Sequence, residues 1–373
     1  MKVVTALGTR PEIIRLSRIM ATLDEYVDQI VVHTGQNYDY ELSQVFFDDL
    51  SLRKPDYFLN AAGATTASTV GLIIAKMDDV FAAERPDAVV ILGDSNSCLG
   101  AYSAKRRKIP IFHVDAGKRS YDQRVPEEIN RRLIDAIADV NMPCNSIARD
   151  NLLNEGFPID RIFQIGSPMR EVFAQNLDKI KTSDALNRLG VKPGEYFVVS
   201  AHREENVDDP KQLAQLVQTL NNLAKYENKR VVFSVHPRTR KRLEAGAYEL
   251  DPSIRALRPL GFHDYNALQM NSYAVLSDSG AIDEESTLLG FPALNLRNTR
   301  ERYEANDSPG AIMTGVGWPR VSDALKIVKR KREQGLIARS EFEARDGVVS
   351  QKVAQIVVSY ADYVDRFVWH KTP

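Results

Sequence analysis

Cysteine is scarce in this chain of 373 residues, which contains only Cys98 and Cys144. So few cysteines exclude a disulfide framework, and the absence of His-x-x-x-His and Cys-x-x-Cys spacings argues against bound zinc. The only G-x-G pair, Gly315-Val316-Gly317, lacks the third glycine of a dinucleotide fingerprint, and no G-x-x-x-x-G-K-S/T segment occurs. Nothing therefore indicates NAD or ATP, and we expect no cofactor.

An excess of one charge is missing as well, because 49 Lys and Arg residues stand against 50 Asp and Glu residues, for a net charge of -1. A chain without a basic field is poorly suited to nucleic acid. No apolar run approaches the roughly 18 residues of a membrane-spanning helix. The start, Met1-Lys2-Val3, leads into a strand without the apolar stretch of a signal peptide. We expect a cytoplasmic protein with no nucleic-acid or membrane partner.

What the sequence does have is a regular alternation of short apolar runs and longer stretches with helical spacing. This pattern predicts the α/β class, with two Rossmann-like, doubly wound domains of residues 1–168 and 169–358. The expected strands are 2–7, 29–34, 88–92, 110–114, 140–144, 162–165, 195–200, 230–235, 254–258, 274–277 and 292–296. The expected helices include 11–23, 40–49, 65–82, 98–107, 126–138, 146–154, 210–226 and 349–367.

Short polar segments stand where several of the expected strands end. In open parallel sheets, ligands bind outside the carboxyl ends of the strands, so two such domains facing each other would gather these segments in one cleft. Their arginines, carboxylates, histidine and helix-opening glycines indicate an anionic ligand and acid–base chemistry. The segments are Gly8–Glu12, Gly93-Asp94, His113–Gly117, Ser200–Glu204 and Ser277–Gly280.

In the first domain the carboxylates in question are Asp94, Asp115 and the pair Glu127-Glu128. Converging carboxylates could act as general acid and base, or bind a metal through oxygen ligands. Alternatively, the two glutamates are first-turn helix residues favoured by the dipole. Four arginines would compete for the carboxylates in the same cleft: Arg10, Arg119, Arg124 and Arg131.

The second domain offers His202, His236 and Arg238, and the turn Ser279-Gly280 before a helix. Backbone N–H groups in such a turn bind anions, typically phosphate, although an ordinary serine N-cap explains the same residues. Glu285 lies nearly two turns into that helix, where its carboxylate could accept hydrogen bonds from ribose hydroxyls. His236 and Arg238 could equally be structural or exposed.

In their order and spacing, these segments resemble the non-hydrolysing UDP-N-acetylglucosamine 2-epimerases over almost the whole chain. Other passages resemble one branch of that family, the capsule and O-antigen enzymes that make UDP-N-acetyl-L-fucosamine. The family motifs are GTRPEIIRLS at 8–17, GDSNS at 93–97, HVDAGKRS at 113–120, PEEINR at 126–131, AHREEN at 201–206 and SDSGAIDEES at 277–286. The branch passages are TGQNYDYEL at 34–42, KPDYFLNAAG at 54–63, DQRVPEE at 122–128 and HPRTR at 236–240.

The resemblance implies a GT-B-like fold, with the chain end, about 359–373, crossing back to the first domain, and a homodimer. It also implies C2 epimerisation of a UDP-N-acetylhexosamine, from UDP-2-acetamido-2,6-dideoxy-L-talose to UDP-N-acetyl-L-fucosamine. Since no carbonyl stabilises a carbanion at C2, UDP would leave C1 as the C2 proton is removed, and then add back with the proton on the opposite face. Alternatives are a UDP-N-acetylglucosamine 2-epimerase, hydrolysing or not, and a catalytically silent UDP-sugar-binding homologue. A retaining glycosyltransferase of the same fold suits these carboxylates less well.

The same resemblance implies roles for the residues that match the family motifs position by position. The segment 262–266 would supply the uracil contact. His202 would be a further catalytic residue, near the sugar and the diphosphate. The acid–base groups would be Asp94, Asp115 and Glu127, and the UDP-binding residues Arg10, Arg15, His236, Ser279, Gly280 and, for the ribose, Glu285.

Four positions depart from the family pattern. Arg15 replaces a lysine, which keeps the charge and adds bidentate phosphate geometry. Asp115 replaces a glutamate and is shorter by roughly 1.5 Å, where a misplacement near 1 Å can cost about a hundredfold in rate. Lys118 replaces an asparagine and could either lower the pKa of Asp115 or face solvent. Gln36-Asn37 replaces a Gln-His pair associated with allosteric UDP-sugar binding, so we expect no regulation by UDP-N-acetylglucosamine.

Overall fold

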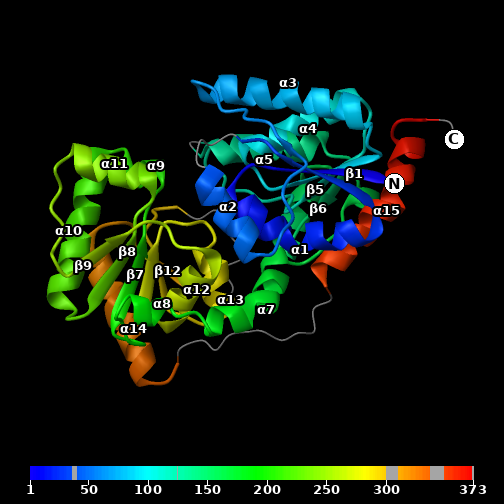
Figure 1. Ribbon diagram of the computed structural model, residues 1–373. Helices are drawn as coiled ribbons and strands as arrows, with labels where there is room; N and C mark the ends of the chain where they lie inside the picture. Colours follow the sequence, from blue (N-terminus) through cyan, green and yellow to red (C-terminus); the bar gives the residue numbers. More distant parts are fainter. Residues whose placement is uncertain (36–39, 124, 300–309, 337–347, 372–373) are drawn as a thin grey trace. The chain divides into compact units, whose positions relative to one another are not determined.

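The computed structural model describes residues 1–35, 40–123, 125–299, 310–336 and 348–371 (Figure 1). The chain divides into two compact units, which we call unit 1 (Met1–Gln175 with Ala344–Pro373) and unit 2 (Asn176–Glu343). Each unit contains a six-stranded parallel sheet with helices on both faces. The expected α/β class with two doubly wound sheets is therefore confirmed.

The sheet of unit 1 has the order β3-β2-β1-β4-β5-β6. Its central strands β1 and β4 are almost entirely buried and apolar, as is typical of parallel strands covered on both faces. In register, Val4 stands opposite Ile30 on one side and Val89 on the other. The strands are β1 Lys2–Leu7, β2 Asp28–His33, β3 Tyr57–Phe58, β4 Ala88–Leu92, β5 Ile111–Val114 and β6 Val140–Met142.

Helices α3, α4 and α5 cover one face of this sheet, and α1, α2 and α15 lie on the other (Figure 1). Helix α15 packs against α1, where the Thr22 hydroxyl lies 2.8 Å from that of Ser350. The final helix thus belongs to unit 1, as the sequence led us to expect. The helices are α1 Arg10–Tyr26, α2 Tyr40–Asp49, α3 Thr66–Glu84, η1 Asn96–Gly100, α4 Ala101–Arg106, α5 Pro126–Ile137, α6 Ser146–Asn154, η2 Ile159–Arg161, α7 Pro168–Lys181 (which runs into unit 2) and α15 Val349–Phe367.

Unit 2 repeats the doubly wound plan with the strand order β12-β11-β10-β7-β8-β9. Helix α10 begins at Pro210, and its N-cap Asp209 accepts a hydrogen bond of 2.8 Å from the Lys211 N–H. Its leucines and Val217 join α14 in the core over one face of the sheet. The strands are β7 Tyr196–Ser200, β8 Arg230–Ser234, β9 Ile254–Leu257, β10 Ala274–Ser277, β11 Ala293–Asn295 and β12 Ala311–Met313. The helices are α8 Ala185–Arg188, α9 Glu204–Val207, α10 Pro210–Tyr226, α11 Pro237–Ala245, α12 Phe262–Asn271, α13 Ile282–Leu289 and α14 Trp318–Glu333.

Four elements differ from the sequence prediction. The strand expected at 162–165 is wrong, because its backbone makes no continuous ladder. It forms an isolated bridge between Asn141 and Ile162 and one hydrogen bond from the Ile165 N–H to the Pro143 carbonyl. The short edge strands β3 and β12 were not predicted, and the helix expected at 98–107 is divided into η1 and α4. In the part of the chain that the structure describes, no helix combines the length and the apolar character needed to cross a membrane.

Candidate active site

The polar segments of unit 1 follow strands that are neighbours in the sheet. Strands β1, β4 and β5 lie side by side and parallel, so the segments after them meet at one edge. Hydrogen bonds join the first two of these segments: the hydroxyls of Ser95 and Ser97 donate to the Glu12 carboxylate at 2.7 and 2.8 Å. The sequence-based grouping of these segments is therefore reproduced in unit 1.

Glu12 is the buried anchor of this edge. Its carboxylate also accepts from the backbone N–H groups of Gly8 and Thr9, at 2.8 and 2.7 Å, and from the Thr9 hydroxyl. Burial raises the pKa of Glu12, and the hydroxyl and N–H donors act against that rise. The Thr9–Glu12 capping box signals this role in the sequence, yet Glu12 was not among the expected site residues.

Asp115 lies among charged side chains directly after β5. Its side chain is 4% exposed, and its carboxylate lies 3.4 Å from Nη1 of Arg15 and in contact with Nζ of Lys118. The Cys144 thiol donates to the same carboxylate, and burial together with that anion raises the pKa of Cys144 well above its usual value. Of the two alternatives for Lys118, the structure favours contact with Asp115 over exposure to solvent.

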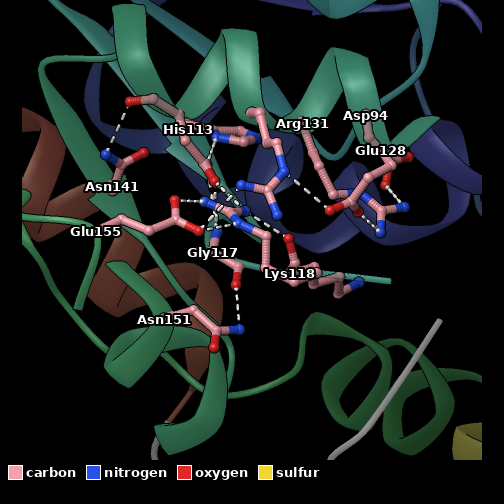
Figure 2. Close-up of polar contacts among 12 residues, drawn as sticks. Asp94, His113, Gly117, Lys118, Glu128, Arg131, Asn141, Asn151 and Glu155 are labelled. Carbon is pink, nitrogen blue, oxygen red and sulfur yellow. Dashed lines mark hydrogen bonds and ion pairs between the residues drawn. The ribbon is translucent and has the colours of Figure 1, made fainter. Parts of the chain in front are cut away.

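Asp94 lies directly after Gly93, at the end of β4, and pairs with a cation of its own. Nη2 of Arg131 lies 2.7 Å from the Asp94 carboxylate, while Nη1 lies 3.1 Å from that of Glu128 (Figure 2). The Asp94 side chain is 29% exposed, whereas that of Glu128 is buried. Asp94 is therefore the more accessible carboxylate of this pair, and Arg131 fixes its position.

The paired glutamates at the start of α5 differ in burial. Glu128 accepts from the Ser120 backbone and hydroxyl, at 2.8 and 3.0 Å, and pairs with Arg131 and Arg132. Burial alone would raise the pKa of Glu128, but these hydrogen bonds and charges outweigh it and lower the pKa. Glu127 is half-buried in the same first turn. The structural role thus falls on Glu128, which leaves Glu127 as the acid–base candidate.

A second group of charged side chains is buried in unit 1, around Arg119 and Asp135. Arg119 donates to Asp135 at 2.7 Å and makes a double hydrogen bond with Glu155 at 2.7 and 2.5 Å. Burial disfavours the charged form of Arg119, yet these carboxylates raise its pKa. His113 lies 2.9 Å from Asp135 through Nδ1. Arg119 therefore does not pair with Asp94 or Asp115, as a shared cleft would have allowed.

In unit 2 the corresponding anchor is Asp278, directly after β10, which the sequence analysis did not single out. Its buried carboxylate accepts from the backbone N–H groups of His202 and Arg203, both at 2.9 Å, and from the Asn206 amide at 3.1 Å. Nδ1 of His202 lies 3.1 Å from the same group. Burial would raise the pKa of Asp278, but the charge of His202 and these donors lower it to about 2. Asp278 thus orients the imidazole of His202.

The remaining expected residues of unit 2 lie around this anchor. The ring of His236 is 5.6 Å from that of His202, and its Nδ1 caps α11 by accepting from the Arg238 N–H at 3.3 Å. The Ser279 hydroxyl accepts from the Ala281 N–H at 3.2 Å, in the turn that precedes α13. The Glu285 carboxylate accepts from the Gln269 amide at 3.1 Å, and Gly280 lies beside Ser279 in the turn.

Arg10 is exposed at the start of α1, with its guanidinium 5.6 Å from the centre of the Phe46 ring. The segment 262–266, expected to contact uracil, forms the first turn of α12. Arg124 and the pair Gln36-Asn37 lie outside the described residues.

Known proteins resemble the chain over nearly its full length. The model of the family described as UDP-N-acetylglucosamine 2-epimerase matches residues 21–358. The structure of a UDP-N-acetylglucosamine 2-epimerase from Rickettsia bellii is 46% identical, with a TM-score of 0.90 and 100% of both chains covered. The UDP-GlcNAc 2-epimerase of Methanocaldococcus jannaschii, solved with UDP-GlcNAc and UDP, is 32% identical, with a TM-score of 0.88 over 96% of this chain and 100% of that one.

A relative with a different substrate in its name is also similar. The UDP-2,3-diacetamido-2,3-dideoxy-D-glucuronate 2-epimerase of Pseudomonas aeruginosa is 34% identical over 87% of this chain and 92% of its own. A UDP-glucosyltransferase of Polygonum tinctorium, at 12% identity and a TM-score of 0.60, shares the fold alone. With the epimerase structures, it confirms the expected GT-B-like fold class.

Proposed function

This chain belongs to the UDP-N-acetylglucosamine 2-epimerase family, and from that premise we propose that it is a non-hydrolysing C2 epimerase acting on UDP-2-acetamido-2,6-dideoxy-L-talose to give UDP-N-acetyl-L-fucosamine. The observation that carries the proposal is the pair of strand-end carboxylates Asp94 and Asp115, each held by its own cation. Anchored carboxylates at neighbouring strand ends suit proton transfer, because their positions and charges are fixed before substrate binds.

The proposed reaction removes and restores the proton at C2 on opposite faces of the sugar. A carboxylate, Asp94 or Glu127, takes the C2 proton while the C1–O bond breaks and UDP leaves with the electron pair. UDP then forms the C1–O bond again as the proton is delivered to the other face from the Asp115 side. Two separately held groups support this assignment, since one group cannot reach both faces.

Unit 2 is the proposed holder of UDP. Ser279 and Gly280 lie in a turn before α13, and backbone N–H groups in such a position stabilise a diphosphate. His202, oriented by Asp278, would lie near the sugar and the diphosphate, and His236 beside it would help to bind UDP. Glu285 is proposed to bind the ribose. From unit 1, Arg10 and Arg15 would add positive charge for the leaving diphosphate.

The sugar itself is proposed from the branch passages, such as DQRVPEE at 122–128 and HPRTR at 236–240. UDP-N-acetylglucosamine is the second candidate, because it gives its name to the 46% identical Rickettsia bellii relative. The Pseudomonas aeruginosa relative is named for another sugar again, so similarity over the whole chain does not choose between them.

Proton NMR in D2O, with each UDP-sugar offered separately, tests the proposal. We expect deuterium at C2 of an intact UDP-sugar, and a faster reaction with the 6-deoxy-L-talo substrate. Faster exchange with UDP-N-acetylglucosamine would instead establish the second candidate. Release of free UDP with no epimer would identify a hydrolysing enzyme, and binding without any exchange would identify a silent UDP-sugar-binding protein.

The proposed setting follows the same resemblance: a cytoplasmic homodimer that serves capsule or O-antigen synthesis. Light scattering of the purified protein measures the dimer directly, and a mass equal to one chain of 41.9 kDa would contradict it.

A further inference from the structure

Lys118 stands in a tight turn that folds it back onto Asp115. Two residues of this turn have left-handed backbone angles, Asp115 with φ +65° and Gly117 with φ +79°. A Cβ at position 117 would meet the carbonyl oxygen of Ala148 at 2.2 Å, so only glycine fits there. The turn places Nζ of Lys118 against the Asp115 carboxylate.

The backbone on both sides of Lys118 is held by the buried charge network. The Gly117 N–H donates to Asp135 at 3.2 Å, and the Gly117 carbonyl accepts from the Asn151 amide at 2.9 Å (Figure 2). Arg119 donates to the Lys118 carbonyl at 2.5 Å. The Lys118 side chain is 11% exposed and that of Asp115 is 4% exposed. The ammonium of Lys118 is therefore fixed in place, unlike that of a solvated surface lysine.

The Asp115 carboxylate and the three groups in contact with it differ in chemistry. These three groups are the guanidinium of Arg15, the ammonium of Lys118 and the thiol of Cys144. The Asp115 carboxylate lies against two cations, Arg15 and Lys118, and it holds them in place through these contacts. The guanidinium of Arg15 does not deprotonate in proteins. The thiol of Cys144 holds its proton, since its pKa is raised. Lys118 supplies the ammonium of this cluster, a group whose N–H bonds are proton donors and which the turn holds against Asp115.

We propose that Lys118 is a catalytic acid–base residue of the epimerisation and that Asp115 is its positioning partner. The inference rests on the proposed function and deepens it. In the re-addition step the Lys118 ammonium gives one proton to C2 while a UDP oxygen forms the bond to C1. Nζ is left as a neutral amine, and the carboxylate that took the first proton is left protonated. Exchange with water restores both, which introduces solvent deuterium at C2. In the reverse direction the neutral amine removes the C2 proton as UDP leaves.

Two substitutions separate proton transfer from charge. Lys118→Arg keeps a cation beside Asp115 but carries no transferable proton, whereas Lys118→Met removes both. We expect each to lower kcat at least about a hundredfold, the usual range for a lost acid–base group, with the Kd for UDP unchanged. Exchange at C2 in D2O should fall in parallel with kcat.

A matched control is Lys326→Met. Lys326 also pairs with an aspartate three residues earlier, Asp323 at 2.9 Å, but its side chain is 74% exposed on α14. We expect this variant to behave as wild type. Thermal unfolding is measured for every variant, and Lys118→Arg alone decides if Lys118→Met does not fold.

Three results have distinct meanings. Retention of wild-type turnover by Lys118→Arg would show that only charge is needed and would overturn the proposal. A weakened Kd for UDP with kcat preserved would make Lys118 a diphosphate ligand and would overturn it equally. Wild-type protein without any exchange at C2 would instead refute the proposed function, before the variants are compared.

Discussion

The two units hold the carboxylates at the ends of their parallel strands by different means. In unit 1 the partners are cationic side chains: Arg131 holds Asp94 after β4, and Lys118 holds Asp115 after β5. In unit 2 the buried Asp278 is held by backbone N–H groups, an amide and an imidazole. The same position in the same kind of sheet can thus be stabilised by fixed charges or by hydrogen bonds.

This difference suits the two halves of the proposed reaction. Fixed charges keep carboxylates ionised and immobile, which proton transfer at a sugar carbon requires. Backbone donors in a turn match the oxygen atoms of a diphosphate without bringing a counter-charge that must be displaced. The strand-end carboxylates of unit 1 would then act mainly on turnover and the turn before α13 in unit 2 mainly on UDP affinity, and substitutions at these two places test that division.

The largest effect is expected from Asp115→Ala. Loss of this carboxylate removes the partner that positions Lys118 and Arg15, and we expect kcat to fall by about 10²–10⁴-fold, because the proton transfer assigned to Lys118 is lost with its position. Glu285→Ala in unit 2 should weaken UDP binding and leave kcat nearly unchanged. Steady-state kinetics and calorimetry of UDP binding measure both. Intact turnover in Asp115→Ala would show that unit 1 does not carry the chemistry through this residue.

Asp135→Ala addresses the charge network that supports unit 1. Asp135 is fully buried and accepts from Arg119 and the Gly117 N–H. Breaking a buried ion pair from one side costs about 3–5 kcal/mol, so the urea midpoint should fall sharply. Asp78→Ala removes the partner of Arg107 in a surface ion pair at 2.6 Å, and that midpoint should not change. Equal shifts of the urea midpoint in the two variants would mean that burial of this ion-pair network contributes nothing to stability.

The lowered pKa of Asp278 predicts that the free energy of unfolding depends on pH. Its pKa in the folded protein is about 2, lowered from 3.8, so the folded state favours the ionised form. That stability is present above pH 4 and is lost as the pH falls towards 2, by about 2 kcal/mol at 1.36 kcal/mol per pKa unit. The difference in unfolding free energy between wild type and Asp278→Asn, measured from pH 5 to pH 2, should shrink by that amount. A constant difference would contradict the lowered pKa.

The sequence predicted the elements better than the contacts. The bounds of α10 at 210–226 and α15 at 349–367 agree with the structure, because amphipathic spacing and a proline at the first turn are local signals. The contact of Lys118 with Asp115 was left open, since it depends on two left-handed residues in one turn. The partners of Arg119 come from α5 and from the residue after α6, which no local pattern links.

The expected strand at 162–165 illustrates the same limit. An apolar run predicts burial, but it forms a strand only if a neighbour offers a full ladder. Here the pairing is limited to the bridge at Asn141 and one hydrogen bond to the Pro143 carbonyl. Burial of Ile162 and Ile165 was therefore foreseeable and their pairing was not. The catalytic roles expected for Asp94, Glu127 and His202 stay predictions, because position alone does not measure proton transfer.

The smallest effect is expected from Ser279→Ala, which separates the side chain of the turn before α13 from its backbone N–H groups. The hydroxyl accepts one hydrogen bond, from the Ala281 N–H at 3.2 Å, so its loss should cost about 0.5–1.5 kcal/mol of stability. If the turn before α13 binds the diphosphate through its N–H groups, UDP affinity should fall only a few-fold, because the backbone donors remain. A Gly280→Pro substitution removes one of those donors, and its effect on the Kd for UDP should be much larger. The reverse ranking would mean that the Ser279 side chain, and not the backbone of the turn, holds the ligand in unit 2.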